Sequence, residues 1–170
     1  MVAPSVGWRK TGRIDSMGGR FWPRRGHLHH CKTEADFLSG PGFAFIPGTA
    51  FLVHREVFQE TGGLDEALVI YWDDVDWSMR VQAKGYPLRL DLQWQVRHHV
   101  GKTCHGKSLY SLYYFQRNRR RISRRYCKNG LETLVFEVLF SIDLIRLFVK
   151  LVRRARWRDL GYLHRIWLEA

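Results

Sequence analysis

The run Tyr-Trp-Asp-Asp-Val-Asp at residues 71–76 is the feature that most restricts how this chain can fold locally. The chain is strongly basic, with 28 Lys and Arg residues against 16 Asp and Glu residues, yet five of the acids fall within residues 65–76. Adjacent carboxylates repel each other, so holding them together costs stability unless a cation or a proton transfer uses them. The alternative is a solvated turn ahead of a helix, with Asp76 as the N-cap.

Length and composition indicate one compact domain. At 170 residues with 45% hydrophobic residues, the chain is long enough to bury a core. The net charge of +12 predicts attraction to polyanions such as nucleic acid, anionic lipid or phosphorylated substrates. An odd number of cysteines without paired spacing argues against a disulfide framework and fits a reducing, cytosolic setting. These cysteines are Cys31, Cys104 and Cys127.

Local patterns predict a mixture of strands and helices in the first half of the chain. Residues 1–42 are rich in Gly, Pro and Arg, which predicts loops with one short strand near the start. Charged residues interrupt this stretch before an apolar run develops, so we expect no signal peptide. The segment from Thr49 to Val53 is predicted to be a buried strand, and Arg55 to Thr61 a short helix that Gly62 and Gly63 close.

The second half is predicted to be mainly helical. A helix from Asp76 to Lys84 is expected to end at Gly85. Residues 87–92 and 94–98 are then predicted to form two strands. From Ser108 onward the pattern predicts helix to the end of the chain.

The segment from Leu131 to Val152 is densely apolar, but charged residues interrupt it. Its longest uncharged stretch, Val138 to Ile142, is far shorter than the roughly 20 residues that span a membrane. A basic flank adds Arg146, Lys150, Arg153, Arg154, Arg156 and Arg158. This combination favours an amphipathic helix on an anionic membrane surface. The alternative is a helix packed on its own domain or on a second subunit.

Five motifs surround the acidic run in a fixed order. They are Gly-Thr-Ala-Phe-Leu-Val-His-Arg-Glu-Val-Phe (48–58), Gly-Gly-Leu-Asp-Glu (62–66), Gly-Tyr-Pro (85–87), Val-Arg-His-His (96–99) and Tyr-Tyr-Phe-Gln-Arg-Asn (113–118). Together they resemble the C-terminal half of a family 2 glycosyltransferase, especially the rhamnosyltransferase-like and galactofuranosyltransferase-like members. The resemblance implies an α/β fold: the acceptor-side part of a GT-A-type, Rossmann-like domain over residues 1–107, then a helical extension over residues 108–170.

The resemblance also implies a reaction and its residues. The reaction is inverting transfer from a nucleotide-diphosphate sugar to a glycan or lipid-linked acceptor, as in cell-surface polysaccharide synthesis. Asp74 is the implied general base for the acceptor hydroxyl, and Asp73 the residue that tunes or orients it. His98 is the implied ligand of a divalent ion, Mn²⁺ or Mg²⁺, on the diphosphate. Tyr71 and Trp72 are expected to stack on a sugar ring.

Three more residues are expected near the substrate. Gly62 and Gly63 allow a close backbone approach just before the acidic run. Arg117 either faces a phosphate, because a planar guanidinium suits that group, or pairs with an acid in the core. The sequence leaves both roles open for Arg117.

The implied metal site is incomplete in this sequence. The family carries a metal-binding Asp-x-Asp in a preceding nucleotide-binding half, whereas the Asp-x-Asp here, Asp74-Val75-Asp76, belongs to the later motif. We therefore expect the metal to be shared with an Asp-x-Asp that this chain lacks. We also expect the chain to work as a truncated half, with a partner chain or as a homo-oligomer, peripheral at the cytoplasmic face of the cell membrane.

Two other classes of protein remain open. A non-catalytic basic module for nucleic acid or anionic membrane is favoured by the arginines that follow the aromatic residues 113–115, although no nucleic-acid-binding motif occurs. A zinc domain is the second, because His27, His29, His30 and Cys31 are clustered. They lack the paired spacing that structural zinc sites show.

Overall fold

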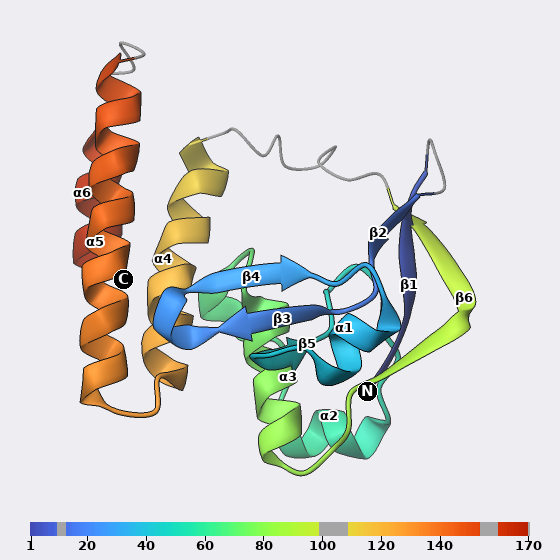
Figure 1. The fold of residues 1–170 in the computed structure, drawn as a ribbon. Coiled ribbons are helices and arrows are strands. Elements are labelled where there is room, and N and C mark those ends of the chain that lie inside the picture. The colour runs from blue at the N-terminus through green and yellow to red at the C-terminus, as the bar shows by residue number, and fades with distance from the viewer. Residues whose placement is uncertain (10–12, 99–108, 154–159, 170) are drawn as a thin grey trace. The chain divides into compact units, whose positions relative to one another are not determined.

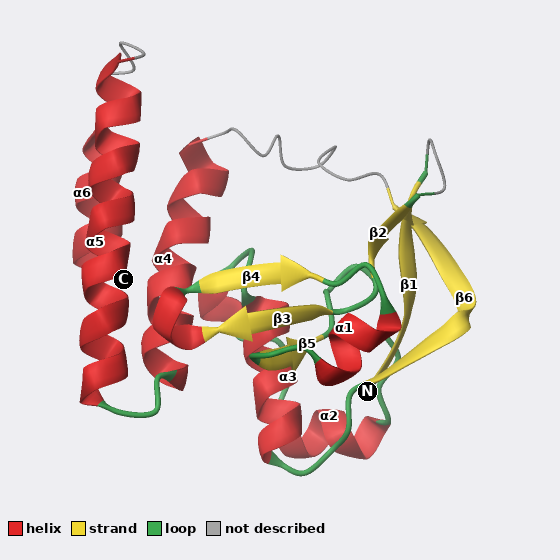
Figure 2. Cartoon of the chain, viewed as in Figure 1, coloured by secondary structure: helices red, strands yellow, loops and turns green. Residues whose placement is uncertain are grey.

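The computed structural model describes residues 1–9, 13–98, 109–153 and 160–169, a mixture of helices and small sheets (Figures 1 and 2). The chain divides into two compact units. The sheet unit comprises residues 1–21, 28–69 and 73–102. The helical unit comprises residues 22–27, 70–72 and 103–170. The helical unit thus takes two short segments from the first half of the chain.

Two three-stranded sheets are formed by the first hundred residues. In the first, β1 (Val2–Trp8) lies between β2 (Ile14–Ser16), which is antiparallel to it, and β6 (Arg89–His98), which is parallel (Figure 1). In the second, β3 (Gly19–Trp22) lies between β4 (His27–His30) and the antiparallel β5 (Phe43–Phe45). The parallel pair joins segments that are more than 80 residues apart.

The sheet unit also contains the helices α1 (Glu34–Ser39), α2 (Arg55–Thr61) and α3 (Asp73–Ala83) and the 3₁₀ turn η2 (Glu66–Leu68). The helix α3 is tied to the chain at β5 by two side chains. Ser78 accepts a hydrogen bond from the Ile46 amide at 3.0 Å, and Gln82 donates one to the Ala44 carbonyl at 2.8 Å. These bonds fix α3, and therefore the acidic run at its start, within the sheet unit.

Aromatic packing holds α3 in the core of the sheet unit. Trp77 is buried, and the rings of Phe51 and Phe58 lie 5.0 and 5.7 Å from its ring. The surrounding core includes Met1, Ala3, Cys31, Phe37, Ile46, Val57 and Val81. Burial of a ring of this size is one of the larger hydrophobic contributions that a small unit can make.

The helical unit consists of α4 (Leu109–Tyr126), α5 (Gly130–Arg153), α6 (Leu160–Glu169) and the 3₁₀ turn η1 (Pro23–Arg25). Its core is formed by Phe136, Phe140 and Ile166. Asn129 caps α5 by accepting the Glu132 amide at 2.9 Å, as side chains at helix starts commonly do. None of the helices in the described part of the chain is both long enough and apolar enough to cross a membrane.

The prediction of loops over residues 1–42 is wrong in most of its length, because β1 to β4 and α1 occupy this region. Their pairing partners lie far along the chain, and local composition does not reveal them. The buried strand predicted from Thr49 to Val53 is also wrong. Only Leu52 pairs, with Val2, and Leu52 is exposed while Phe51 and Val53 pack against the core. Two backbone hydrogen bonds between Leu52 and Val2, together with the packing of Phe51 and Val53, hold this segment in place of a strand ladder.

Two boundaries also differ from the predictions. The helix α3 begins at Asp73, so Asp76 lies inside its first turn and is not an N-cap. The two strands predicted over residues 87–98 form one strand, β6. Its register against β1 shifts between Asp91 and Gln95, close to the predicted break.

Other predictions are confirmed. The helix α2 spans the predicted residues and ends at Gly62, whose φ is 69°. Gly85, with φ 83°, follows the end of α3. Helices occupy the described residues from 109 onward apart from the turn before α5. Cys31 and Cys127 are free thiols, while Cys104 lies outside the described residues.

Candidate functional site

The backbone that leads into the acidic run is strained. Val69, Tyr71 and Trp72 have φ angles of 63°, 66° and 70°. Residues with a side chain rarely adopt this left-handed region, and each instance costs about 1–3 kcal/mol. Such a segment persists only when surrounding contacts impose it, and strain of this kind is concentrated at functional sites.

Asn118 of α4 imposes part of this conformation. Its side-chain amide donates hydrogen bonds to the carbonyls of Ile70 and Tyr71, at 2.8 and 3.0 Å. Asn118 is fully buried, and its side-chain oxygen Oδ1 accepts a hydrogen bond from Arg117 Nε at 3.0 Å. Because a buried amide needs these partners, Asn118 fixes the position of the two carbonyls. We call residues 69–72 with their Asn118 bonds the strained segment.

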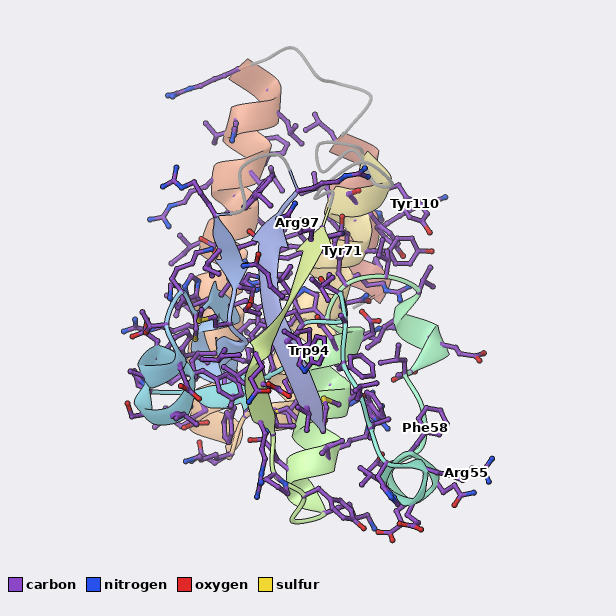
Figure 3. The ribbon with its side chains drawn as sticks, turned by 90° about the vertical axis from the view of Figure 1, so that its right-hand side faces the viewer. Arg55, Phe58, Tyr71, Trp94, Arg97 and Tyr110 are labelled. Carbon is purple, nitrogen blue, oxygen red and sulfur yellow. The ribbon has the colours of Figure 1, made fainter. Side chains whose placement is uncertain are left out.

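The two predicted sugar-stacking aromatics have different surroundings. Both rings contact Phe115 of α4, at centroid distances of 5.8 Å for Tyr71 and 5.5 Å for Trp72. Trp72 is buried, so its ring is part of the packing of the helical unit. Tyr71 keeps exposed surface, and Figure 3 labels its position. Of the pair, Tyr71 is therefore the residue that is not fully buried.

Asp74 is held by the backbone. Its Oδ2 accepts a hydrogen bond from the Gly48 amide at 2.9 Å, and its Oδ1 accepts one from the Val75 amide at 2.8 Å. Gly48 stands at the start of the predicted 48–58 motif, so the structure brings two of the sequence motifs into direct contact. A Cβ on Gly48 would lie 3.5 Å from the Cβ of Asp74, which shows how closely the two segments approach.

The electrostatics of Asp74 differ from those of an ordinary surface acid. Burial of its carboxyl group, supported by the negative charge of Asp73, raises the pKa of Asp74 from 3.8 to about 6. The amide hydrogen bonds from Gly48 and Val75 act in the opposite direction but do not cancel the effect of burial. The group is therefore mostly ionised at neutral pH and takes up a proton only slightly below it.

Asp76 performs a structural task instead. It is fully buried, and its Oδ2 forms an ion pair with Arg80 Nε at 2.9 Å. The same guanidinium donates to the carbonyls of Thr61 and Gly63, the latter at 2.7 Å. The pair therefore fastens the first turn of α3 to the end of α2.

The two glycines proposed near the substrate belong to the same connection between α2 and α3. Gly62 accepts a hydrogen bond from the Trp77 ring at 2.7 Å through its carbonyl, and Gly63 accepts the bond from Arg80. Figure 3 shows Arg55 and Phe58 on the neighbouring helix α2. The structure thus gives Gly62 and Gly63 a role in the turn that precedes the acidic run, and their contact with a substrate stays a prediction.

Arg117 packs inside the helical unit. It is buried, and its guanidinium carbon lies 4.7 Å from the centroid of the Tyr114 ring and 5.8 Å from that of Tyr113. Its Nε bond to Asn118 orients the amide that holds the strained segment. Arg117 therefore acts on the strained segment indirectly, by orienting the side chain of Asn118. Contact with a phosphate stays a prediction.

His98 lies at the end of β6, opposite Trp8 of β1, and its carbonyl accepts the Arg9 amide at 3.2 Å. Within the described residues, no three His, Cys, Asp or Glu side chains are grouped so that they hold a metal ion. The described residues therefore do not supply a complete metal site, and we derive no chemical step through a metal. For the alternative zinc site, Cys31 is buried in the core.

Two residues of the site were not found by sequence reasoning. Gly48 supplies an amide to Asp74 from 26 positions upstream, a contact for which the sequence holds no local signal. Asn118 was noted as part of the Tyr-Tyr-Phe-Gln-Arg-Asn motif but was given no role. The signal available in the sequence was an asparagine within a predicted helix, a position that asparagine disfavours.

Comparison with known proteins gives one distant likeness. No family model and no solved structure matches the chain. Two curated proteins do: the N-acetylglucosaminyl-diphospho-decaprenol L-rhamnosyltransferases of Mycobacterium tuberculosis strains CDC 1551 / Oshkosh and ATCC 25618 / H37Rv. Each is 30% identical over 88 residues, which cover 52% of this chain and 29% of the relative. The chain therefore matches less than a third of the length of these relatives.

This likeness supports a distant relationship to glycosyltransferases over about half of the chain. The mixed α/β architecture with small sheets is compatible with that relationship. Since no solved structure matches, the finer assignment to a GT-A-type domain stays a prediction.

Proposed function

We propose that this chain is the acceptor-side half of an inverting glycosyltransferase, and that Asp74 is its general base. The observation that carries the proposal is the state of the Asp74 carboxyl group: two backbone amides orient it, and burial raises its pKa to about 6. A base works best when its pKa lies near the operating pH. The distant likeness to two rhamnosyltransferases supports the class of reaction.

In the proposed reaction, Asp74 takes the proton from an acceptor hydroxyl. The acceptor oxygen then forms a bond to the anomeric carbon of the donor sugar. The bond between that carbon and the diphosphate oxygen breaks, and the nucleoside diphosphate leaves with the electron pair. Attack from the face opposite the leaving group inverts the configuration. Asp73 assists by keeping the pKa of its neighbour high, because its charge opposes ionisation of Asp74.

The class of substrate is proposed by analogy with the relatives. Their names describe transfer of L-rhamnose to an N-acetylglucosaminyl-diphospho-decaprenol, a lipid-linked acceptor. By this analogy we propose a nucleotide-diphosphate sugar as donor and a lipid-linked glycan of cell-wall polysaccharide synthesis as acceptor. Tyr71, whose ring keeps exposed surface, is the residue we propose for stacking on a sugar.

The donor half must come from elsewhere. We propose that a nucleotide-binding part, on a partner chain or in a longer form of the protein, supplies the Asp-x-Asp that the sequence analysis expects. A divalent ion held there, with His98 as one ligand, would neutralise charge on the leaving diphosphate. The roles proposed for Asp74, Asp73 and Tyr71 do not depend on that ion.

The test uses extracts of source cells that lack this chain, supplemented with purified wild-type or variant protein. Transfer of labelled rhamnose from its nucleotide diphosphate to the lipid-linked acceptor is measured across pH. Wild-type activity is expected to fall below a pH of about 6, where Asp74 takes up a proton. Asp74→Asn is expected to lose about 10²–10⁴-fold in rate, the usual contribution of a general base.

Two matched variants make the test specific. Asp73→Asn is expected to keep transfer but to move the acid limb of the pH profile to lower pH, because the neighbouring charge that raises the pKa of Asp74 is gone. Asp36→Asn, at an exposed position on α1, is expected to change neither rate nor profile. Full transfer by Asp74→Asn, or no restoration by the wild-type protein, would refute the proposal.

The alternative of a basic binding module for nucleic acid is less well supported. Several arginines of α4 are already engaged within the helical unit. Arg119 pairs with Asp143 at 2.8 Å, Arg120 pairs with Glu137 at 3.0 Å, and Arg117 is buried. Side chains tied in this way are not free to follow a phosphate backbone, which exposed basic residues must do.

A further inference from the structure

The helix α5 is apolar on two opposite faces. One face contributes Phe136, Phe140 and Leu151, which are all buried. The other face, which we call the outer stripe, is exposed to solvent. It consists of Leu131, Leu134, Val138, Ile142, Ile145 and Val149. An ordinary surface helix of a soluble protein has one apolar face, so the second face calls for a partner.

The outer stripe is continuous. Its members follow one another at intervals of three or four residues, which places them on one side of a helix. At a rise of about 1.5 Å per residue, the stripe runs for roughly 27 Å. Leu131, in the first turn, is 70% exposed and Ile145, in the C-terminal half, is 62% exposed, so the apolar surface is present in both halves of the helix.

The charges of α5 are arranged unequally around the stripe. Its acids are used within the helical unit: Glu137 pairs with Arg120, and Glu132 accepts the Lys128 amide. Asp143 pairs with Arg119 at 2.8 Å and also, at 3.4 Å, with the more exposed Arg146. The basic residues Arg146, Lys150 and Arg153 are exposed along the C-terminal half of the helix. The surface beside the stripe is therefore positive, and its partner must be apolar and negatively charged.

Apolar and basic side chains meet at one place on this helix. A shallow hollow of about 420 Å³ is lined by Ile145, Val149, Arg146, Lys150 and Arg153. Two apolar side chains beside three cationic ones match the two parts of an anionic lipid, an acyl chain and a phosphate headgroup. The same combination is typical of helices that lie in the plane of a membrane interface.

We propose that α5 docks on the surface of an anionic lipid bilayer, with the outer stripe buried at the boundary of headgroups and acyl chains. Arg146, Lys150 and Arg153 contact the lipid phosphates. Charged residues recur along α5, so the helix lies along the surface. Docking of this kind holds whether or not Asp74 catalyses transfer, so it is tested without an activity assay.

The experiment measures co-sedimentation of the full chain with vesicles of phosphatidylcholine alone or of equimolar phosphatidylcholine and phosphatidylglycerol. The stripe variant Val138→Glu/Ile145→Glu is expected to lower binding to anionic vesicles at least tenfold. The control Leu38→Glu/Leu52→Glu adds the same charge at two exposed leucines of the sheet unit and is expected to bind like the wild type. Circular dichroism verifies that each variant keeps its helices.

A second variant tests the charges without touching the stripe. Lys150→Gln/Arg153→Gln is expected to weaken binding to anionic vesicles severalfold and to reduce its dependence on salt, because two headgroup contacts are lost. Unchanged binding by the stripe variant, or no binding by the wild type, would overturn the proposal. It would also be overturned if sedimentation velocity showed a wild-type dimer that the stripe variant dissociates, since a second copy would then cover the stripe.

Discussion

Replacing Asp74 with Asn changes the pH dependence of folding in a way that needs no knowledge of the substrate. In the unfolded chain this carboxyl group ionises near its ordinary pKa of 3.8, whereas in the folded chain burial holds the pKa at about 6. The folded state therefore keeps a proton over a range of pH in which the unfolded state has released it. Stability is lost as the pH rises through this range, since the unfolded state binds fewer protons.

The size of the effect follows from the shift in pKa. Each pKa unit corresponds to about 1.4 kcal/mol, so a shift of about two units gives an upper limit of about 3 kcal/mol. Asp74 retains some exposed surface, and solvent screening reduces the value to about 2 kcal/mol. The Asn side chain does not titrate. The free energy of unfolding of Asp74→Asn should therefore rise by about 2 kcal/mol relative to the wild type between pH 4 and pH 7.

Urea unfolding of both proteins at several pH values measures this difference. The comparison is valid where the dependence on urea concentration has the same slope in both proteins. Any constant cost of exchanging the carboxylate for an amide cancels between the two ends of the pH range. Asp36→Asn, at an exposed position, serves as the control and should follow the wild type. If the difference in unfolding free energy between Asp74→Asn and the wild type stays constant from pH 4 to pH 7, the raised pKa of the Asp74 carboxyl group is refuted.

Three further substitutions test the framework around the site by urea unfolding. Asn118→Ala removes two buried donors from the strained segment and should destabilise the protein by about 2–4 kcal/mol; a loss below about 1 kcal/mol would show that other contacts hold the segment. Arg80→Met leaves the Asp76 carboxylate buried without its cation and should lower the free energy of unfolding by about 3–5 kcal/mol. The double variant Asp76→Leu/Arg80→Met also removes the carboxylate and should recover most of this loss. Gly26 has a φ of 54°, and Gly26→Ala would place a Cβ 2.6 Å from the buried ring of Phe136, so this variant should lose about 2 kcal/mol or more of stability. The control Gly130→Ala, at a position with open space around it, should be neutral or slightly stabilising.

Helix ends were the part of the fold that the sequence predicted best, because their signals are local. Gly62 and Gly85 mark the ends of α2 and α3, and both have positive φ angles that favour glycine. The long pattern after residue 108 also predicted helices correctly, since an apolar period is visible within one segment. By contrast, β1 pairs with β6 from the other end of the sheet unit, and no pattern within residues 1–42 records that partner.

The sequence supplied candidate residues for the site but not their arrangement. The resemblance to glycosyltransferases drew attention to Asp73, Asp74 and Tyr71, but the sequence could not show that Gly48 supplies an amide to Asp74. Nor could it show that Asn118 holds the backbone just ahead of the acidic run. Both are contacts between segments far apart in the chain, and only the folded structure creates them.

The contrast between Asp74 and Asp76 decides which acid suits proton transfer. The two stand in the same turn of one helix, but their surroundings in the folded chain differ. Asp76 is fully buried, and its carboxylate is engaged in the ion pair with the Arg80 guanidinium that links α3 to the end of α2. The amides of Gly48 and Val75 orient Asp74 and favour its ionised form, but burial outweighs them and raises its pKa to about 6. A carboxylate that must accept and release a proton at neutral pH needs the second environment, and for this reason we propose Asp74, and not Asp76, as the base.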